Sequence, residues 1–173
     1  MMTGRSTFNI YLLIIASSLL TGCETTQSNK RGKEASTLRL HLQANSDGTP
    51  HTTTASVYRE KPIQVPISSN PFLTEIDLES AAVVEVQGGF AIQVQFNRHG
   101  ALLLENVTTV SRGRHIAILS QFTETRWLAA PLISRRITDG TLVFTPDASR
   151  EEADRIVRGL SNFIVAARKK SKF

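Results

Sequence analysis

Cysteine is almost absent from this 173-residue sequence, which contains a single one, Cys23. One thiol cannot close an intramolecular disulfide, and it cannot supply the several thiolates of a structural zinc site. A buried core must therefore hold the fold together, and the chain is long enough to form one.

The motifs of metal binding and of hydrolysis are also missing. The four histidines show no His-x-x-x-His spacing, and no Gly-x-Ser-x-Gly motif occurs. His41 and His115 alternate with apolar residues in strand-like segments, which predicts that both histidines are exposed. We expect no metal ion, no cofactor and no enzymatic activity, with a hydrolase of scattered active residues as the alternative.

Aromatic residues make up only 6% of the sequence and do not interleave with its basic residues. Because aromatic residues among basic ones are typical of nucleic-acid binding, the net charge of +5 does not predict a nucleic-acid partner. Basic residues concentrate only at the C-terminal end, over residues 168–172. This run is interpreted either as the solvated end of a helix or as a contact with anionic lipid.

No apolar run is long enough to span a bilayer. The run at residues 10–16 falls far short of the ~20 residues that a transmembrane helix needs. Arg5 is the only charged residue before Glu24. A basic start followed by a short apolar centre predicts a signal peptide over residues 1–22 rather than a transmembrane anchor.

The sequence LTGC at residues 20–23 resembles the bacterial lipobox, in which a leucine lies three residues before a lipid-modified cysteine. The resemblance implies that Cys23 becomes the first mature residue and carries several acyl chains, which together anchor a protein stably to a membrane. Glu24 stands where enteric lipoproteins of the inner membrane carry aspartate. In a cell with two membranes we therefore expect the periplasmic face of the outer membrane.

The segment after Cys23 has no aliphatic side chain larger than alanine up to residue 36. Such a segment cannot bury enough apolar surface to offset the entropy lost on ordering. We therefore predict a flexible tether over residues 23–36 and a single folded domain over residues 37–173.

Period-two alternation of apolar and polar residues predicts strands at 37–44, 55–59, 63–67, 114–119, 125–129 and 141–145. The clearest pattern is a hairpin over residues 84–96, whose turn is expected at Gly88 and Gly89. Residues 73–82 are expected to form a short helical turn, with Thr74 as its N-terminal cap and Asp77 three residues on.

Two helices are expected. Asn97 is positioned to cap a helix that ends near Ser111, with an apolar face of Leu103, Leu104, Val107 and Val110. Ser149 and Glu152 form a capping box that opens a C-terminal helix, whose inward face is Ala153, Ile156, Val157, Leu160 and Ile164. The order of elements predicts an α+β fold, with an antiparallel or mixed sheet and two helices packed on one face.

Residues 72–162 resemble the first periplasmic head domain of SecD, a subunit of the bacterial preprotein translocase. The pieces that carry the resemblance are Leu73-Thr74, Ile76-Asp77, Glu79-Ser80-Ala81, Val94-Gln95-Phe96, Gly100-Ala101, Thr108-Thr109, Gly113 to Ile118, Ala130 to Ile133, Ile137, Gly140 and Ser149 to Ala153. The resemblance implies an α+β head that touches unfolded polypeptide emerging from the translocation channel.

Binding is the function that these observations favour. Phe90 at the hairpin tip, together with Phe122 and Trp127, is a candidate apolar contact patch, unless these rings belong to the core. An unpaired strand edge early in the domain is another possible peptide site. We expect a lipid-anchored, non-enzymatic accessory module that binds exported polypeptide or an envelope or translocase protein. The alternative is a structural envelope lipoprotein that uses the fold for another ligand.

Overall fold

A computed structural model describes residues 34–46 and 48–170 of the chain. The predicted signal peptide, Cys23 and most of the predicted tether lie outside these residues. The elements are, in chain order, β1 (Thr37–Leu42), β2 (Thr52–Val57), β3 (Ile63–Ser68), β4 (Leu73–Thr74), η2 (Glu75–Asp77), β5 (Leu78–Val86), β6 (Gly89–Phe96), α3 (Arg98–Val110), β7 (Ile116–Gln121), β8 (Thr125–Ala129), β9 (Thr141–Phe144) and α4 (Arg150–Lys170).

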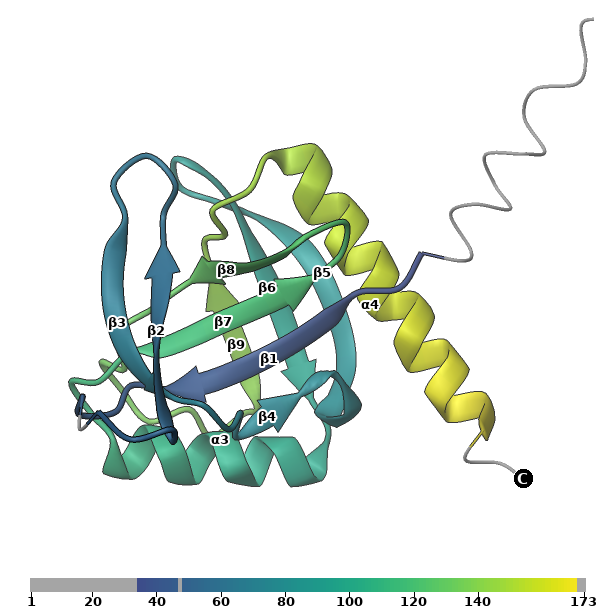
Figure 1. Cartoon of the computed structure of the whole chain (residues 1–173). Helices are drawn as coiled ribbons and strands as arrows, with labels where there is room; N and C mark the ends of the chain where they lie inside the picture. The colour runs from purple at the N-terminus through teal and green to yellow at the C-terminus, as the bar shows by residue number, and fades with distance from the viewer. Residues whose placement is uncertain (1–33, 47, 171–173) are drawn as a thin grey trace, which may run out of the picture. The chain divides into compact units, whose positions relative to one another are not determined.

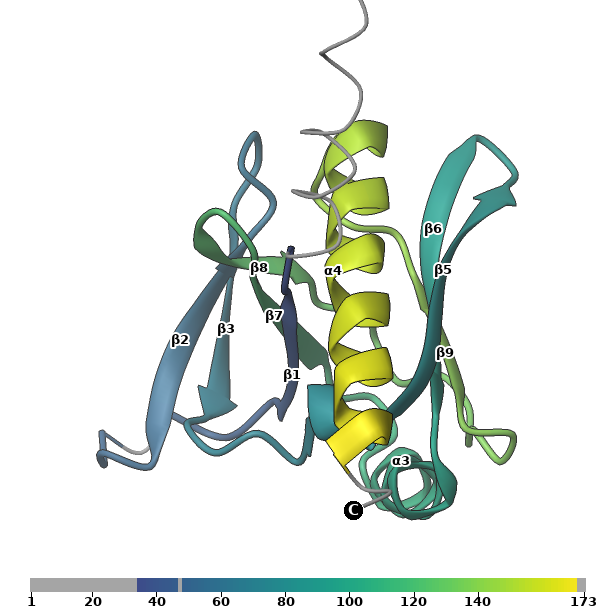
Figure 2. The ribbon, with the colours of Figure 1, turned by 90° about the vertical axis from the view of Figure 1, so that its right-hand side faces the viewer.

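The strands form three antiparallel sheets. Their strand orders are β4-β1-β7-β8, β2-β3 and β5-β6-β9. The predicted α+β fold with antiparallel sheets and two helices is confirmed. The structure adds that α4 lies between the two larger sheets in the view of Figure 2, while α3 is seen end-on below them.

The main core fills the space that these layers enclose. It combines Leu38 and Leu40 of β1, Ile92 and Val94 of β6, and the inward face of α4, among others. The residues predicted for that helix face are confirmed: Ala153, Ile156, Leu160 and Ile164 are buried, and Val157 packs against them. Burial of such side chains contributes about 1.5–3 kcal/mol each, so this cluster is the main source of stability.

A second core lies on the other face of the sheet that contains β1 and β7. The β2–β3 hairpin lies beside that sheet (Figure 1), and its Val57, Val65 and Ile67 pack with Ala117 of β7. The face of β1 opposite the main core is therefore covered at His41 and exposed at Arg39, so alternation along this strand does not separate a wet face from a dry one.

The prediction that His41 is exposed is wrong, because the second core covers it. Only 5% of His41 is exposed, and its Nδ1 lies 2.9 Å from the carbonyl oxygen of Ser68. Its ring meets the ring of Trp127 edge-on, with centroids 5.3 Å apart. His115 is half-buried, and its Nδ1 lies 2.8 Å from Oε1 of Gln43.

The prediction of a short helical turn over residues 73–82 is wrong except at Glu75–Asp77, which form η2. Thr74 caps η2 and Asp77 completes the capping box, as predicted. From Leu78 onward the chain is a strand that pairs with β6. Long-range pairing therefore overrides the local helical preference.

The predicted hairpin is confirmed as β5 and β6, with a shift of one residue at its turn. Gly88 lies in the turn with φ of 86°, which glycine adopts without strain. Gly89 instead opens β6 and pairs with Val86.

Both predicted helix caps are present. The Asn97 side chain accepts a hydrogen bond from Gly100 N at 2.9 Å, and the Ser149 hydroxyl accepts one from Glu152 N at 3.2 Å. The predicted inward face of α3 is wrong at Val110, which is 75% exposed and is the last residue of the helix.

Residues 34–36 pack against α4, which corrects the predicted end of the flexible tether. The carboxylate of Glu34 accepts a hydrogen bond from Arg158 at 3.1 Å, and its carbonyl accepts one from Asn162 at 2.9 Å. Ser36 is buried beside Gly159, where any Cβ would overlap the Ser36 hydroxyl and lie 2.8 Å from its backbone nitrogen. We call residues 34–36 the N-terminal strap.

Within the described residues, neither helix combines the length and apolar character that crossing a membrane requires.

Candidate functional site

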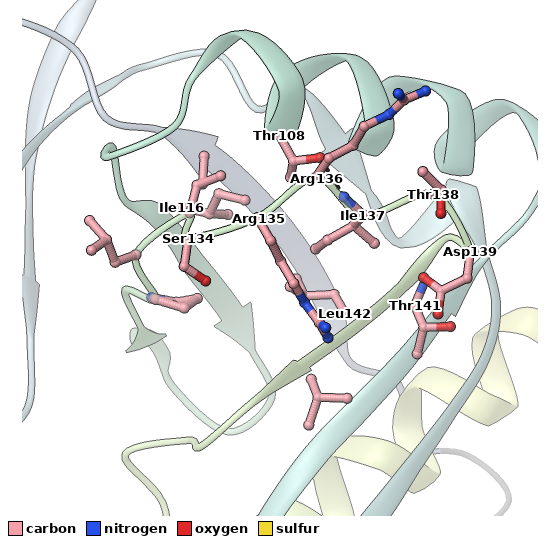
Figure 3. A pocket seen from close by; sticks show the side chains of 14 residues that line it. Thr108, Ile116, Ser134, Arg135, Arg136, Ile137, Thr138, Asp139, Thr141 and Leu142 are labelled. Atoms are coloured by element: carbon pink, nitrogen blue, oxygen red, sulfur yellow. Dashed lines mark hydrogen bonds between the residues drawn. The ribbon is translucent and has the colours of Figure 1, made fainter.

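A groove of about 400 Å³ lies beside β9 in the described part of the chain. One wall is the irregular segment 131–140 and the other is β9, and Thr108 of α3 and Ile116 of β7 add to the lining (Figure 3). We call residues 131–140 the rim segment.

Backbone hydrogen bonds hold the start of the rim segment to β7 and the turn before it. Ile116 N donates to the Pro131 carbonyl at 3.0 Å, and Ile133 N donates to the Arg114 carbonyl at 2.8 Å. Gly113 N in turn donates to the Ile133 carbonyl at 3.0 Å. These bonds satisfy the backbone of a segment that belongs to no strand, and they fix its position.

Helix α3 holds the middle of the rim segment. Ile137 N donates to Oγ1 of Thr108 at 3.0 Å, and this hydroxyl itself donates to the Leu104 carbonyl at 2.7 Å. Arg136 forms an ion pair with Glu105 of the same helix. Thr108 is therefore buried as a fully hydrogen-bonded link between the helix and the groove wall.

The end of the rim segment is fixed to β6. The Gln95 amide donates to the Asp139 carbonyl at 2.9 Å, and Phe96 N donates to the Gly140 carbonyl at 2.9 Å. Gly140 has φ of +68°, and a Cβ there would lie 2.7 Å from Cβ of Ala101. Only glycine fits this position without strain or movement of the helix.

The fixed ends leave Ser134 and Arg135 exposed at the centre of the groove wall. The Arg135 side chain extends from the rim segment toward β9 in Figure 3. Among the described residues it has no hydrogen-bond or ion-pair partner. Leu132 and Val143 add apolar surface, being 55% and 46% exposed. The groove thus combines exposed apolar surface with one positive charge, that of Arg135, which no acidic side chain among the described residues neutralises.

The groove lining offers little for acid–base or nucleophilic chemistry. Its ionisable side chains are Arg135, Arg136 and Asp139, and the lining has no histidine or lysine that could act as a general base for the Ser134 hydroxyl. No cluster of three metal-ligating side chains occurs within residues 34–46 and 48–170. The composition suits binding, because apolar surface with a few polar groups is typical of ligand sites.

The three aromatic residues predicted as a contact patch do not come together. Phe90 and Phe122 are half-buried against the main core, each with an arginine of α4 over its ring: Arg150 at 5.5 Å and Arg155 at 4.7 Å. Trp127 packs against the second core. None of the three lines the groove.

Sequence reasoning did not find the groove residues Leu132, Arg135 and Val143. The segment between Pro131 and Asp139 has no periodicity, so no element is expected there, and Val143 lies in the strand predicted over residues 141–145 without a local sign that it faces a groove. Two adjacent arginines in a stretch with no helical or strand pattern were the one available signal. The predicted lipidation site, Cys23, lies outside the described residues.

A sequence model of the SecDF P1 head subdomain matches residues 52–161. That range is more than half of the chain. The chain belongs to the SecDF P1 head family. The predicted resemblance to a SecD head is thereby confirmed, and the match begins earlier than predicted, so that it includes the β2–β3 hairpin. Membership relates this P1 head protein to the machinery of protein translocation.

Two solved structures of SecDF share the fold. One, described as a membrane component that enhances protein export, is 23% identical with a TM-score of 0.57, covering 83% of this chain and 71% of that one. The other, SecDF in a super-membrane-facing form, is 23% identical with a TM-score of 0.58, covering 83% of this chain and 21% of that one. The chain thus spans about a fifth of the second structure. No curated protein matches its sequence.

Proposed function

We propose that this protein is a membrane-anchored, non-enzymatic accessory module of protein export that binds exported polypeptide in the groove beside β9. The match of residues 52–161 to the SecDF P1 head carries the proposal. The groove supports it, because it is open, fixed at both ends and lined by apolar and cationic side chains. A segment of unfolded chain exposes apolar side chains and a free backbone, both of which such a groove can contact.

Lipid attachment at Cys23 is the second part of the proposal, and the LTGC sequence supports it. In a cell with two membranes, the protein would face the periplasm from the outer membrane. We expect Cys23→Ser to abolish both incorporation of labelled palmitate and sedimentation with the membrane fraction. The matched control is Thr21→Ser, which keeps the small residue and the cysteine. Continued membrane sedimentation of Cys23→Ser without labelling would contradict a lipid anchor.

Photocrosslinking in intact cells tests the binding function. We place a photoreactive phenylalanine at Ser134, which is exposed on the groove wall, and as a control at Thr109, which is exposed on α3 and does not line the groove. A pulse-labelled secretory protein should crosslink to position 134 and not to position 109. This contrast separates contact within the groove from incidental proximity.

The opposite results are equally informative. Equal crosslinking at both positions would place the contact elsewhere on the surface. Retention on peptidoglycan without polypeptide crosslinks at position 134 would favour the structural envelope lipoprotein instead.

A further inference from the structure

We propose that the groove holds its polypeptide as an extended strand added to the free edge of β9, and that Arg135 selects segments with an acidic side chain. This inference rests on the proposed function and names the mode and chemistry of binding at the same site. It is carried by three features: the edge of β9, the exposed side chains beside it and the charge balance of the groove.

The first feature is an unsatisfied strand edge. β9 pairs with β6 on one side, and no strand within the described residues pairs with its other side. Antiparallel pairs alternate between bonded and non-bonded positions. Because Phe96 N donates to the Gly140 carbonyl, Leu142 and Phe144 bond toward β6, and Val143 directs its N–H and C=O to the groove. A peptide that lies along this edge can therefore form backbone hydrogen bonds with both the N–H and the C=O of Val143.

The rim segment leaves that edge unoccupied. It turns back into β9 at Asp139 and Gly140, so that it and β9 run in opposite directions along the two sides of the groove (Figure 3). Its own backbone groups bond to residues 113–116, α3 and β6, and within the described residues none of its backbone hydrogen bonds goes to the backbone of residues 141–144. Strand addition at such an edge supplies affinity through main-chain hydrogen bonds for any sequence.

The second feature is apolar surface next to the edge. Val143 is 46% exposed, and Leu132 on the opposite wall is 55% exposed. In an added strand, side chains alternate between two faces. One set would therefore lie over Val143 while the other points away, which favours segments with alternating apolar residues.

The third feature is the charge of the groove. Arg136 is paired with Glu105, and the Asp139 carboxylate accepts a hydrogen bond from Thr141 N at 3.1 Å, at the far end of the rim segment. Arg135 is the remaining charged group in the lining and is unpaired within the described part of the chain. A carboxylate on the bound strand can form the bidentate, charge-assisted hydrogen bonds that suit a guanidinium.

Peptide binding to the full chain in detergent tests this inference. The probe is a fluorescein-labelled nine-residue peptide of alternating threonine and valine, with glutamate, glutamine or lysine at its centre. The glutamate peptide should bind about tenfold more tightly than the glutamine peptide, and the lysine peptide more weakly still. Arg135→Gln should remove this preference and keep the weaker binding of the glutamine peptide.

The matched control is Arg98→Gln, which removes an exposed arginine of α3 outside the groove and should leave the preference unchanged. Methylation of alternate peptide nitrogens tests the strand. Methyl groups on the amides that face β9 should abolish binding, whereas methyl groups on the other set should not.

Several outcomes would overturn the inference. Equal affinity for the three peptides would remove the role of Arg135, and equal tolerance of both methylation patterns would remove strand addition. Absence of peptide binding with persistent crosslinks at position 134 in cells would overturn the inference and leave the proposed function standing. Absence of both would overturn the proposed function as well.

Discussion

The protonation of His41 depends on the second core, which buries the histidine ring. Burial lowers the pKa of His41 from its ordinary value of 6.5, and the hydrogen bond with the Ser68 carbonyl opposes this only partly. That bond requires the proton of the neutral ring to sit on Nδ1. Nε2 is buried and has no partner among the described residues. A proton added there gains no hydrogen bond, so the neutral ring is the stable form in the fold.

We therefore predict that His41 makes the protein less stable in acid. The unfolded chain takes up a proton as the pH falls through about 6.5, while the folded chain still resists it, so the free energy of unfolding decreases below that pH. Thermal melting between pH 7.5 and 5.5 measures the effect. His41→Leu should lose less stability over this range than the original protein. The same loss in both proteins would show that His41 is not responsible.

At the scale of elements, the close packing of the N-terminal strap against α4 requires a glycine, Gly159, within the helix. Alanine at an ordinary helix position is more favourable than glycine by about 1 kcal/mol. At Gly159, however, a methyl group would collide with Ser36 and approach the carbonyl carbon of Ala35 to 3.0 Å. The helix can accept alanine there only if the strap moves away.

We predict that Gly159→Ala keeps α4 intact and releases the strap. Hydrogen exchange followed by mass spectrometry should show faster exchange for residues 34–38 and unchanged exchange for residues 150–170. Ser161→Ala is the matched control, because Ser161 lies on the same helix and bonds to the Val157 carbonyl instead of the strap. Unchanged exchange at the strap in Gly159→Ala would contradict the packing described for Ser36.

The contrast between elements that were predictable and those that were not has one physical cause. The hairpin of β5 and β6 and the capped starts of α3 and α4 depend on neighbours within a few residues, and the sequence shows them directly. The burial of His41 depends on strands β2 and β3, and the conversion of residues after Leu78 into a strand depends on β6. Such contacts leave no local pattern.

The candidate site could not be predicted either, because it too depends on contacts between residues far apart in the sequence. Its wall is held by bonds between residues 131–140 and three separate elements, and its charge is uncompensated only because Arg136, and not Arg135, meets Glu105. The aromatic residues that stood out in the sequence serve the two cores or their edges. Large rings are used mainly for packing in a domain of this size, while the proposed binding groove is built from an irregular segment.

At the scale of the whole molecule, the strap determines where a pulling force on the N-terminal side enters the domain. A pull on Glu34 first strains its bonds to Arg158 and Asn162 and then passes along β1. That strand lies between β4 and β7 and has six registered pairs with β7 alone. Ladder hydrogen bonds stand perpendicular to the strand, so a load along its axis shears them together instead of opening them one by one. A load applied at residue 34 is thus carried by β1 in shear.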